Sequence, residues 1–369
     1  MISGKSKFLE LVDEGRKGHN IGLSVGSPKL EVYMDGYLPG TSYLIGAAPG
    51  VGKSTYMLWT FIYQPLMDYL RGNSPERDPY WILFNLEMTQ PQIYAKLLSM
   101  YIFDTFGEEI RFKEMFSRGK DTILSDGHYE LIQKCSDFLD ILDERISCHD
   151  GSLTEDKYTK ILNQELKRFG RWEGNTFIPN NPHQVLGVAV DHMSLVRATP
   201  GRTKKDEMDA ISRASVMARN ATGIVSPIHV AQFNRSSGSD ERLKQAMQDP
   251  TYTDFKDSGA LYEDSQVVIA LHSPHKFKLS SYRKYDVKAL EQCFLAVFLL
   301  KSRFGTSDIL VPIGFYGDCS HFIELPKPDE IYDYEAYETP YWSLKREDTN
   351  EKEETKQDAK KRTKFDYSL

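Results

Sequence analysis

A short run of small residues followed by Lys-Ser is the part of the sequence best suited to chemistry. Residues 46–55 read GAAPGVGKST, the pattern of a phosphate-binding loop, with Ala47 in place of the usual first glycine. Small residues let successive backbone N–H groups point at phosphate oxygens. A glycine-rich turn with an incidental lysine is the alternative, disfavoured because strand, loop, Lys-Ser and helix coincide. The predicted nucleotide-binding residues are Ala48, Pro49, Gly50, Val51, Gly52, Lys53, Ser54 and Thr55.

Two acidic residues follow apolar runs and could complete a hydrolytic site. Residues 185–190 are almost continuously apolar and end at Asp191, which together with the Ser54 hydroxyl could hold Mg²⁺. A second run, 80–85, precedes Glu87, a candidate for activating the attacking water. Ligands of open α/β sheets bind beyond the carboxyl ends of such strands. A helix-capping aspartate and a surface glutamate are the alternatives, and for Glu87 the residues alone leave both readings open.

The elements that must position these groups alternate between strands and helices. This alternation predicts an α/β fold with a mostly parallel twisted sheet and helices on both faces. A short amphipathic helix is expected at 5–16, an irregular loop insertion at 171–183 and a polar loop at 238–257. The expected strands are 41–45, 80–85, 146–149, 185–190, 224–232, 267–271 and 294–300, with a closing hairpin at 309–325; the main helices are 54–69, 91–106 and 205–220.

Composition narrows the class of protein. The net charge is −7, which excludes a globally basic nucleic-acid coat but allows local basic loops. The four cysteines form no CxxC pair, so ordinary thiols are expected instead of a zinc site or a disulfide framework. The sequence shows neither a signal-peptide pattern nor an apolar stretch long enough to span a bilayer. We therefore expect a cytoplasmic protein, in the host cytoplasm if it is viral, without membrane partners.

Several motifs occur in the order found in one family. From about residue 22 to about residue 325 the chain resembles the C-terminal motor domain of DnaB-type replicative helicases, including their phage counterparts. That resemblance implies a RecA-like P-loop NTPase fold. The motifs that carry it are the phosphate-binding loop, Asn85–Met88 (NLEM), Asp191–Val196 (DHMSLV), Ile211–Arg213 (ISR), Val230–Arg235 (VAQFNR), Asp257–Asp264 (DSGALYED) and Lys301–Gly305 (KSRFG).

The resemblance assigns roles to residues at matching positions. It implies that Glu87 is the catalytic base and that Gln232 senses the γ-phosphate and links it to the DNA loops. Arg303 would be a finger that reaches the neighbouring subunit's site, with Lys301 beside it. Without the family, Lys301 and Arg303 would be interpreted as a solvated strand end. The implied activity is ATP-dependent unwinding of DNA in replication by a homo-oligomer, expected to be a hexamer, with ATP and Mg²⁺ bound.

Two polar loops are expected to grip single-stranded DNA. Cationic side chains and backbone amides that bind phosphates give affinity independent of base sequence. Solvated surface loops are the alternative for any single residue. The expected DNA-binding residues are Arg202, Lys204 and Lys205 in the first loop, Arg197–Lys205, and Arg235, Arg242, Lys244, Lys256, Asp257 and Gly259 in the second, Asn234–Gly259.

The chain also departs from the family pattern. His192 stands where a tyrosine or similar residue is usual, and Ser194 where a glutamine is usual. The N-terminal primase-binding domain of bacterial relatives does not precede the motor, which favours a phage-like motor. We expect an N-terminal helix and linker (1–21), a motor domain (22–342) and a charged, disordered tail (343–369). The helix could dock on an adjacent subunit or on its own domain, and the tail, which carries Phe365 and Tyr367, could bind a primase, polymerase or single-strand-binding protein.

Two other functions share these motifs. A RecA-like filament or mediator would bind DNA and use ATP as a switch without displacing strands. An ATP-dependent loader would assemble other proteins without processive movement. The Lys301 and Arg303 pair on a late strand favours the ring motor over both.

Overall fold

A nine-stranded sheet organises the protein, as seen in a computed structural model that describes residues 4–74, 76–174, 176–234 and 249–344. The strand order is β13-β12-β11-β8-β1-β7-β6-β2-β3. Strands β3 to β8 in this order are mutually parallel, and β11, β12 and β13 continue the sheet antiparallel. The strands are β1 Tyr43–Ala47, β2 Asp78–Asn85, β3 Ile146–Asp150, β6 Gln184–Asp191, β7 Val225–Gln232, β8 Val267–His272, β11 Phe294–Ser302, β12 Ile309–Tyr316 and β13 His321–Glu324.

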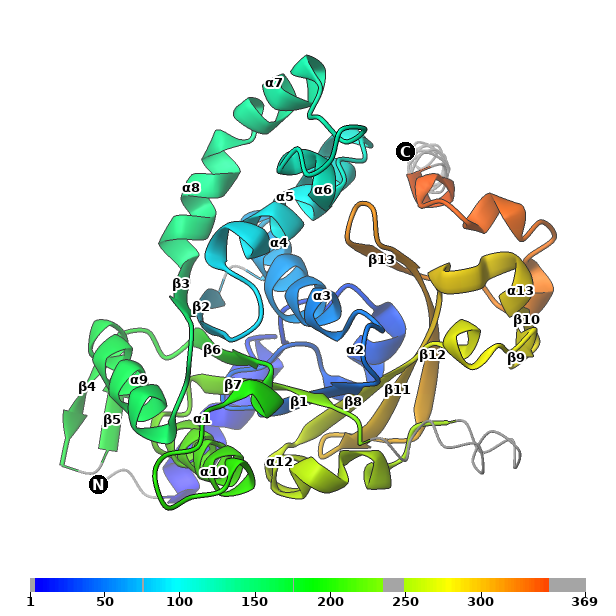
Figure 1. The fold of residues 1–369 in the computed structure, drawn as a ribbon. Helices are drawn as coiled ribbons and strands as arrows, with labels where there is room; N and C mark the ends of the chain where they lie inside the picture. The colour runs from blue at the N-terminus through cyan, green and yellow to red at the C-terminus, as the bar shows by residue number, and fades with distance from the viewer. Residues whose placement is uncertain (1–3, 75, 175, 235–248, 345–369) are drawn as a thin grey trace, which may run out of the picture.

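Helices cover both faces of the sheet, which confirms the predicted fold class (Figure 1). Side chains alternate between two cores: Tyr43 and Ile45 of β1 face one core, and Leu44 faces the other. One face carries α2 Pro28–Met34, α3 Lys53–Leu58, α4 Gln64–Leu70, α5 Gln90–Phe106 and α8 Ser136–Arg145; the other carries α9 Glu155–Phe169, α10 Lys204–Thr222 and α12 Gly259–Asp264. Among the described residues, no helix is long and apolar enough to cross a membrane.

The expected insertion at 171–183 is ordered differently from the prediction. It forms a small antiparallel hairpin of β4 Gly170–Glu173 and β5 Thr176–Pro179. Phe177 is buried against the α9 and α10 side of the sheet, and Trp172 packs edge-on against it at 5.3 Å. The prediction of an irregular loop was wrong because its turn-forming residues were weighted above the alternating apolar residues that flank them.

The helix after β1 contains a π-helical turn that a tryptophan supports. Helices α3 and α4 are joined without a break by the π-helical segment Trp59–Tyr63. Pro65 has no amide hydrogen, so the carbonyl of Phe61 lacks its usual α-helical donor. The indole Nε1 of Trp81 in β2 donates to that carbonyl at 2.7 Å. The contact ties the helix that begins at the phosphate-binding loop to the central sheet.

Removing this indole donor is expected to destabilise the fold. Trp81→Phe leaves the buried Phe61 carbonyl without that donor and should lower the free energy of unfolding by about 2 kcal/mol or more. Trp172→Phe, the same exchange at a half-exposed position, is the control and should change stability by less than about 0.5 kcal/mol. Urea unfolding measures the free energy of unfolding of both variants. Equal stabilities of the two would show that the indole contact does not support the helix.

Candidate nucleotide site

The phosphate-binding loop links the end of β1 to the start of α3. Gly50 and Gly52 have φ angles of 67° and 94°, in the left-handed region that favours glycine. A Cβ at Gly52 would also lie 3.1 Å from the Phe315 ring. The Lys53 side chain begins α3 and is only 8% exposed. A glycine-dependent turn, a helix start and a buried cation fit a bound triphosphate.

Ser54 and Asp191 meet next to this loop. The Ser54 hydroxyl donates to Asp191 Oδ1 at 3.0 Å, and Asp191 is 4% exposed at the end of β6. Burial raises the pKa of Asp191 to about 6, opposed by the hydrogen bond from Ser54 and by the charges of Lys53 and Lys96. A hydroxyl and a carboxylate are oxygen ligands of the kind Mg²⁺ takes when it also binds substrate phosphates. The pair fits the predicted metal role.

Glu87 lies beyond β2, with its carboxylate half exposed and facing a buried imidazole. Glu87 Oε2 is 3.7 Å from His192 Nε2. His192 Nδ1 is 2.6 Å from Ser194 Oγ. Burial and, next, the Lys53 charge lower the pKa of His192 to about 4, so the imidazole is neutral at neutral pH. The two residues that depart from the family pattern thus contact each other, and one of them, His192, also faces the predicted base.

Gln232 ends β7, beside the phosphate-binding loop. Its Cα pairs with that of Ala47, and the next amide, of Phe233, donates to the Ala47 carbonyl at 3.0 Å. The rings of Phe233 and Phe255 pack edge-on over Gly46, where a Cβ would lie 2.2 Å from Phe255. Gly46 therefore has to lack a side chain. Phe233 and Phe255, which lie on either side of residues 235–248, therefore both contact the start of the phosphate-binding loop.

Two lysines in this region were not predicted. Lys96 of α5 donates to Thr55 Oγ1 at 3.0 Å, and Lys276, on the 3₁₀ turn Pro274–Phe277, donates to the Pro49 carbonyl at 2.9 Å. Burial lowers the pKa of both, and the charge of Lys53 lowers that of Lys276 further. No local pattern marks either residue. Only the position of Lys96 on the helix directly after Glu87 could have suggested it.

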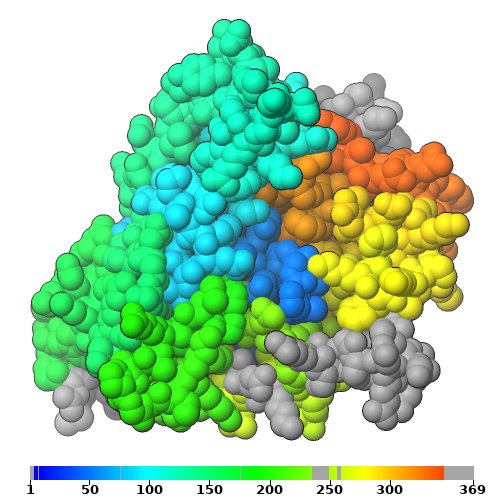
Figure 2. All heavy atoms as spheres, viewed as in Figure 1, coloured from blue at the N-terminus to red at the C-terminus, as the bar shows by residue number. Residues whose placement is uncertain are grey.

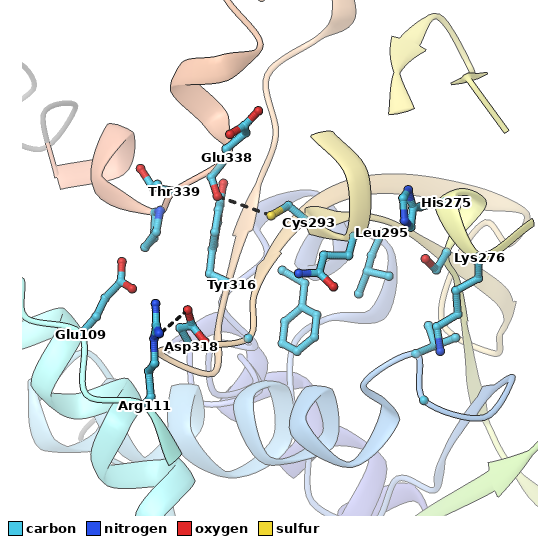
Figure 3. A pocket seen from close by; sticks show the side chains of 17 residues that line it. Glu109, Arg111, His275, Lys276, Cys293, Leu295, Tyr316, Asp318, Glu338 and Thr339 are labelled. Atoms are coloured by element: carbon cyan, nitrogen blue, oxygen red, sulfur yellow. Dashed lines mark hydrogen bonds and ion pairs between the residues drawn. The ribbon is translucent and has the colours of Figure 1, made fainter. Parts of the chain in front are cut away.

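A pocket of about 450 Å³ lies beside the phosphate-binding loop, and Gly50 and Val51 of the loop are among the residues that line it (Figure 3). Gly50 and Lys276 line its inner end, and Phe315 and Tyr316 form part of its wall. At the outer end Arg111 points toward Asp318, with Nε 3.0 Å from Oδ2 (Figure 3). In the space-filling view the segment after β1 reaches the surface between the residues that follow β2 and those that follow β8 (Figure 2).

Arg303 and Lys301 lie at the amino ends of the parallel strands, opposite the ends that carry the phosphate-binding loop. Strand β11 runs antiparallel to β8, so Ser302 pairs with Val267 at the amino end of β8. Arg303 is exposed there, and its amide donates to the Gln266 carbonyl at 3.0 Å. Lys301 Nζ instead donates to the carbonyls of Tyr262 and Glu263 at the end of α12, at 2.8 and 3.0 Å. The two predicted partners of the nucleotide are therefore not at the phosphate-binding loop of the same chain.

The predicted DNA-binding residues fall into three groups. Lys204 and Lys205 are exposed in the first turn of α10. Arg202 is directed toward its own domain, 3.7 Å from carboxylate oxygens of both Glu155 and Glu207. Lys256 and Asp257 lie on the 3₁₀ helix Tyr252–Ser258 and Gly259 begins α12, whereas Arg235, Arg242 and Lys244 lie outside the described residues.

Comparison with known proteins agrees with this geometry. Residues 22–324 match the family model of the DnaB-like helicase C-terminal domain. The chain is 24% identical over 277 residues to "Replicative DNA helicase DnaB" of Helicobacter pylori strain 26695, covering 73% of this chain and 48% of that protein. The protein of the same name from Leifsonia xyli is 24% identical over 317 residues, 84% of this chain and 57% of that one. The chain thus spans about half the length of these curated relatives.

Solved structures show the same fold. The ATPase domain of G40P superposes with a TM-score of 0.64 at 17% identity, covering 88% of this chain and all of that domain. A DnaB-like replicative helicase, solved in a study of its interactions with primase, gives a TM-score of 0.61 at 17% identity, covering 88% of this chain and 67% of that one.

The raised pKa of Asp191 gives a pH-dependent prediction. Only the ionised carboxylate binds Mg²⁺, so a proton competes with the metal below about pH 6. Between pH 6 and pH 5 the affinity for Mg²⁺ with a non-hydrolysable ATP analogue should fall about fivefold through this group, and by only about a tenth between pH 8 and pH 7. Calorimetric titration at each pH measures this affinity. Asp191→Asn is the control, since it retains only the titration of the nucleotide itself; an identical pH response in both proteins would contradict the assignment.

Proposed function

The chain belongs to the DnaB-like helicase C-terminal domain family, and on this premise we propose that it is the ATP-driven motor of a replicative DNA helicase. In this proposal identical subunits form a ring, expected to be a hexamer, that moves along single-stranded DNA. The observation that carries it is the separation of the site into two parts. Lys53, Ser54 and Asp191 lie at the carboxyl ends of the parallel strands, and Arg303 lies at their amino ends.

This separation favours a site shared between subunits. Ala47 pairs with Leu271 at one end of β1, and Tyr43 pairs with Val267 at the other. Four residue steps along a strand span about 13 Å, so Arg303 of the same chain lies too far from Lys53 to touch one γ-phosphate. A head-to-tail contact between copies brings opposite edges together, and such contacts generate rings or filaments. Arg303 would then act in the next subunit's site.

The chemistry we propose is hydrolysis of the terminal phosphoanhydride bond. Glu87 accepts a proton from water as the water oxygen bonds to the γ-phosphorus, and the bond to the bridging oxygen breaks with its electron pair leaving on ADP. Lys53 and the neighbour's Arg303 offset charge that develops on the phosphoryl oxygens. Mg²⁺, when bound at Ser54 and Asp191, would supply Lewis-acid neutralisation of the β- and γ-oxygens. Gln232, which pairs with Ala47, would report the γ-phosphate to the DNA loops.

The pocket beside the loop is our candidate for the base and ribose. It begins at Gly50, and its aromatic wall of Phe315 and Tyr316 offers the apolar surface on which a purine packs. Lys276 at its inner end could contact the phosphates, since it already bonds the Pro49 carbonyl. ATP would then extend from Lys53 away from Asp191, leaving its γ-phosphate toward Glu87.

The DNA contacts are proposed for the loops before α10 and before α12. Lys204 and Lys205 are exposed and fit sequence-independent phosphate binding. Arg202 fits less well because two carboxylates already neutralise it. The second loop is anchored beside the nucleotide: the Asn234 amide donates to the Asp254 carbonyl at 2.9 Å, next to the Phe255 ring that covers Gly46. A shift of the phosphate-binding loop would therefore move this DNA loop through the contact between Gly46 and Phe255.

The N-terminal helix favours assembly. In α1, Gly4–Arg16, four apolar side chains on one side are about half exposed or more: Phe8 64%, Leu9 53%, Leu11 54% and Val12 45%. Of the two positions considered for this helix, docking on an adjacent subunit is therefore favoured over packing on its own domain. Primase, polymerase or a single-strand-binding protein remain proposed partners of residues 343–369.

A forked-duplex assay tests the function and separates it from the alternatives. The full chain with ATP and Mg²⁺ should displace the annealed strand, and Lys53→Ala should abolish both displacement and DNA-stimulated hydrolysis. Replacing ATP by a non-hydrolysable analogue is the second control. Hydrolysis without displacement, with protein bound as filaments on DNA, would favour the RecA-like mediator, and hydrolysis without displacement or filaments would favour the loader.

A further inference from the structure

The turn after β6 holds an imidazole against the carboxylate proposed as the base. The 3₁₀ turn Met193–Leu195 follows Asp191 directly, and the side chains of Met193 and Val196 are buried in the core. The Leu195 amide donates to the His192 carbonyl at 2.9 Å. The backbone on both sides of His192 is therefore fixed, and the imidazole itself is only 6% exposed.

Hydrogen bonding fixes which ring nitrogen carries a hydrogen. His192 Nδ1 lies 2.6 Å from Ser194 Oγ, and Nε2 lies 3.7 Å from Glu87 Oε2. A neutral ring with its hydrogen on Nδ1 would turn the Nε2 lone pair toward a carboxylate, which is repulsive. With the Ser194 hydroxyl donating to Nδ1, the Nε2–H faces Glu87. A protonated ring would present the same hydrogen, so the conclusion does not depend on its charge.

Glu87 needs such a partner. Its side chain is 53% exposed at the end of β2, and within the described part of the chain His192 is the one side chain at ion-pair distance from it. An exposed carboxylate samples several rotamers, whereas a general base must hold one oxygen toward the attacking water. The present separation exceeds a hydrogen bond, and catalytic hydrogen bonds of this kind tighten when substrate binds.

We propose that His192, oriented by Ser194, is a positioning residue that holds Glu87 in the geometry needed to accept the proton from water. The inference rests on the proposed function, because it assigns to Glu87 the role of base in ATP hydrolysis. His192 touches neither the water nor the phosphate in this account. It acts on the rate of the chemical step through Glu87 alone, and the Nε2–H is the group that does so.

The test compares two substitutions at one position in the full chain with single-stranded DNA. His192→Phe keeps a ring but removes the donor, and should lower kcat of DNA-stimulated ATP hydrolysis about tenfold to a hundredfold while KM for ATP changes less than about twofold. His192→Gln can place an amide N–H near the position of Nε2 and should restore much of kcat. His128→Phe is the matched control, because it removes another imidazole–glutamate contact, to Glu114, far along the chain, and should leave kcat unchanged.

A double variant shows whether His192 acts through Glu87. On a Glu87→Gln background, His192→Phe should cause no further loss of the residual rate, since the base it positions is already gone. Ser194→Ala, which leaves the imidazole in place, should lower kcat less than His192→Phe does. Binding of a fluorescent ATP analogue by each variant shows that it is folded.

The outcomes separate the inference from the function on which it rests. Wild-type kcat in His192→Phe, a change confined to KM, failure of His192→Gln to exceed His192→Phe, or the same fold-loss on the Glu87→Gln background would each overturn the positioning role while leaving the motor intact. A wild-type chain that hydrolyses no ATP with DNA would instead refute the proposed function, and the inference with it.

Discussion

Strand register separates Lys53 from Arg303, the two cations that we propose for hydrolysis. The hydrogen-bonded rows of β1, β8 and β11 place Ala47 and Leu271 at one edge of the sheet and Tyr43, Val267 and Ser302 at the other. Side-chain rotation cannot close that distance, since Lys53 follows the first row and Arg303 the second. If Arg303 is the catalytic guanidinium, as we propose, it must come from another copy of the chain. The proposed dependence on assembly thus combines the role that the family resemblance gives to Arg303 with the position that the sheet gives to it.

The electrostatics of the site are consistent with a ligand-dependent centre. Burial shifts the pKa of Asp191 upward and those of His192 and Lys96 downward, in each case toward the neutral form. Charged groups held out of water without full compensation cost stability, and functional sites are where proteins retain such costs. In the proposed complex, phosphate oxygens would pair with Lys53, and Mg²⁺ would bind Asp191. Binding of nucleotide and metal should for that reason stabilise the folded chain.

Sequence reasoning predicted the parts of the site that depend on local patterns. We could predict the glycine positions, Lys53 and the strand ending at Asp191, because backbone conformation and strand burial determine which residue types occur at each position. The contact of His192 with Glu87 was not predicted, since it depends on β6 lying beside β2, which are far apart in sequence. The same holds for Lys96 of α5, because its contact with Thr55 of α3 depends on how these two helices pack on the sheet. The bond from Trp81 to the Phe61 carbonyl likewise forms only through tertiary packing.

Subunit mixing tests the shared site most directly. Lys53→Ala and Arg303→Ala each remove one half of the site, so each protein alone should hydrolyse almost no ATP with DNA. In mixed oligomers, the Lys53 of an Arg303→Ala subunit can meet the Arg303 of a Lys53→Ala subunit, which rebuilds roughly a quarter of the interfaces in an equimolar mixture. We predict that mixing two inactive proteins restores a clear fraction of wild-type hydrolysis. No recovery in mixtures shown to have exchanged subunits, or full activity of Arg303→Ala by itself, would contradict a nucleotide shared between Lys53 of one subunit and Arg303 of the next.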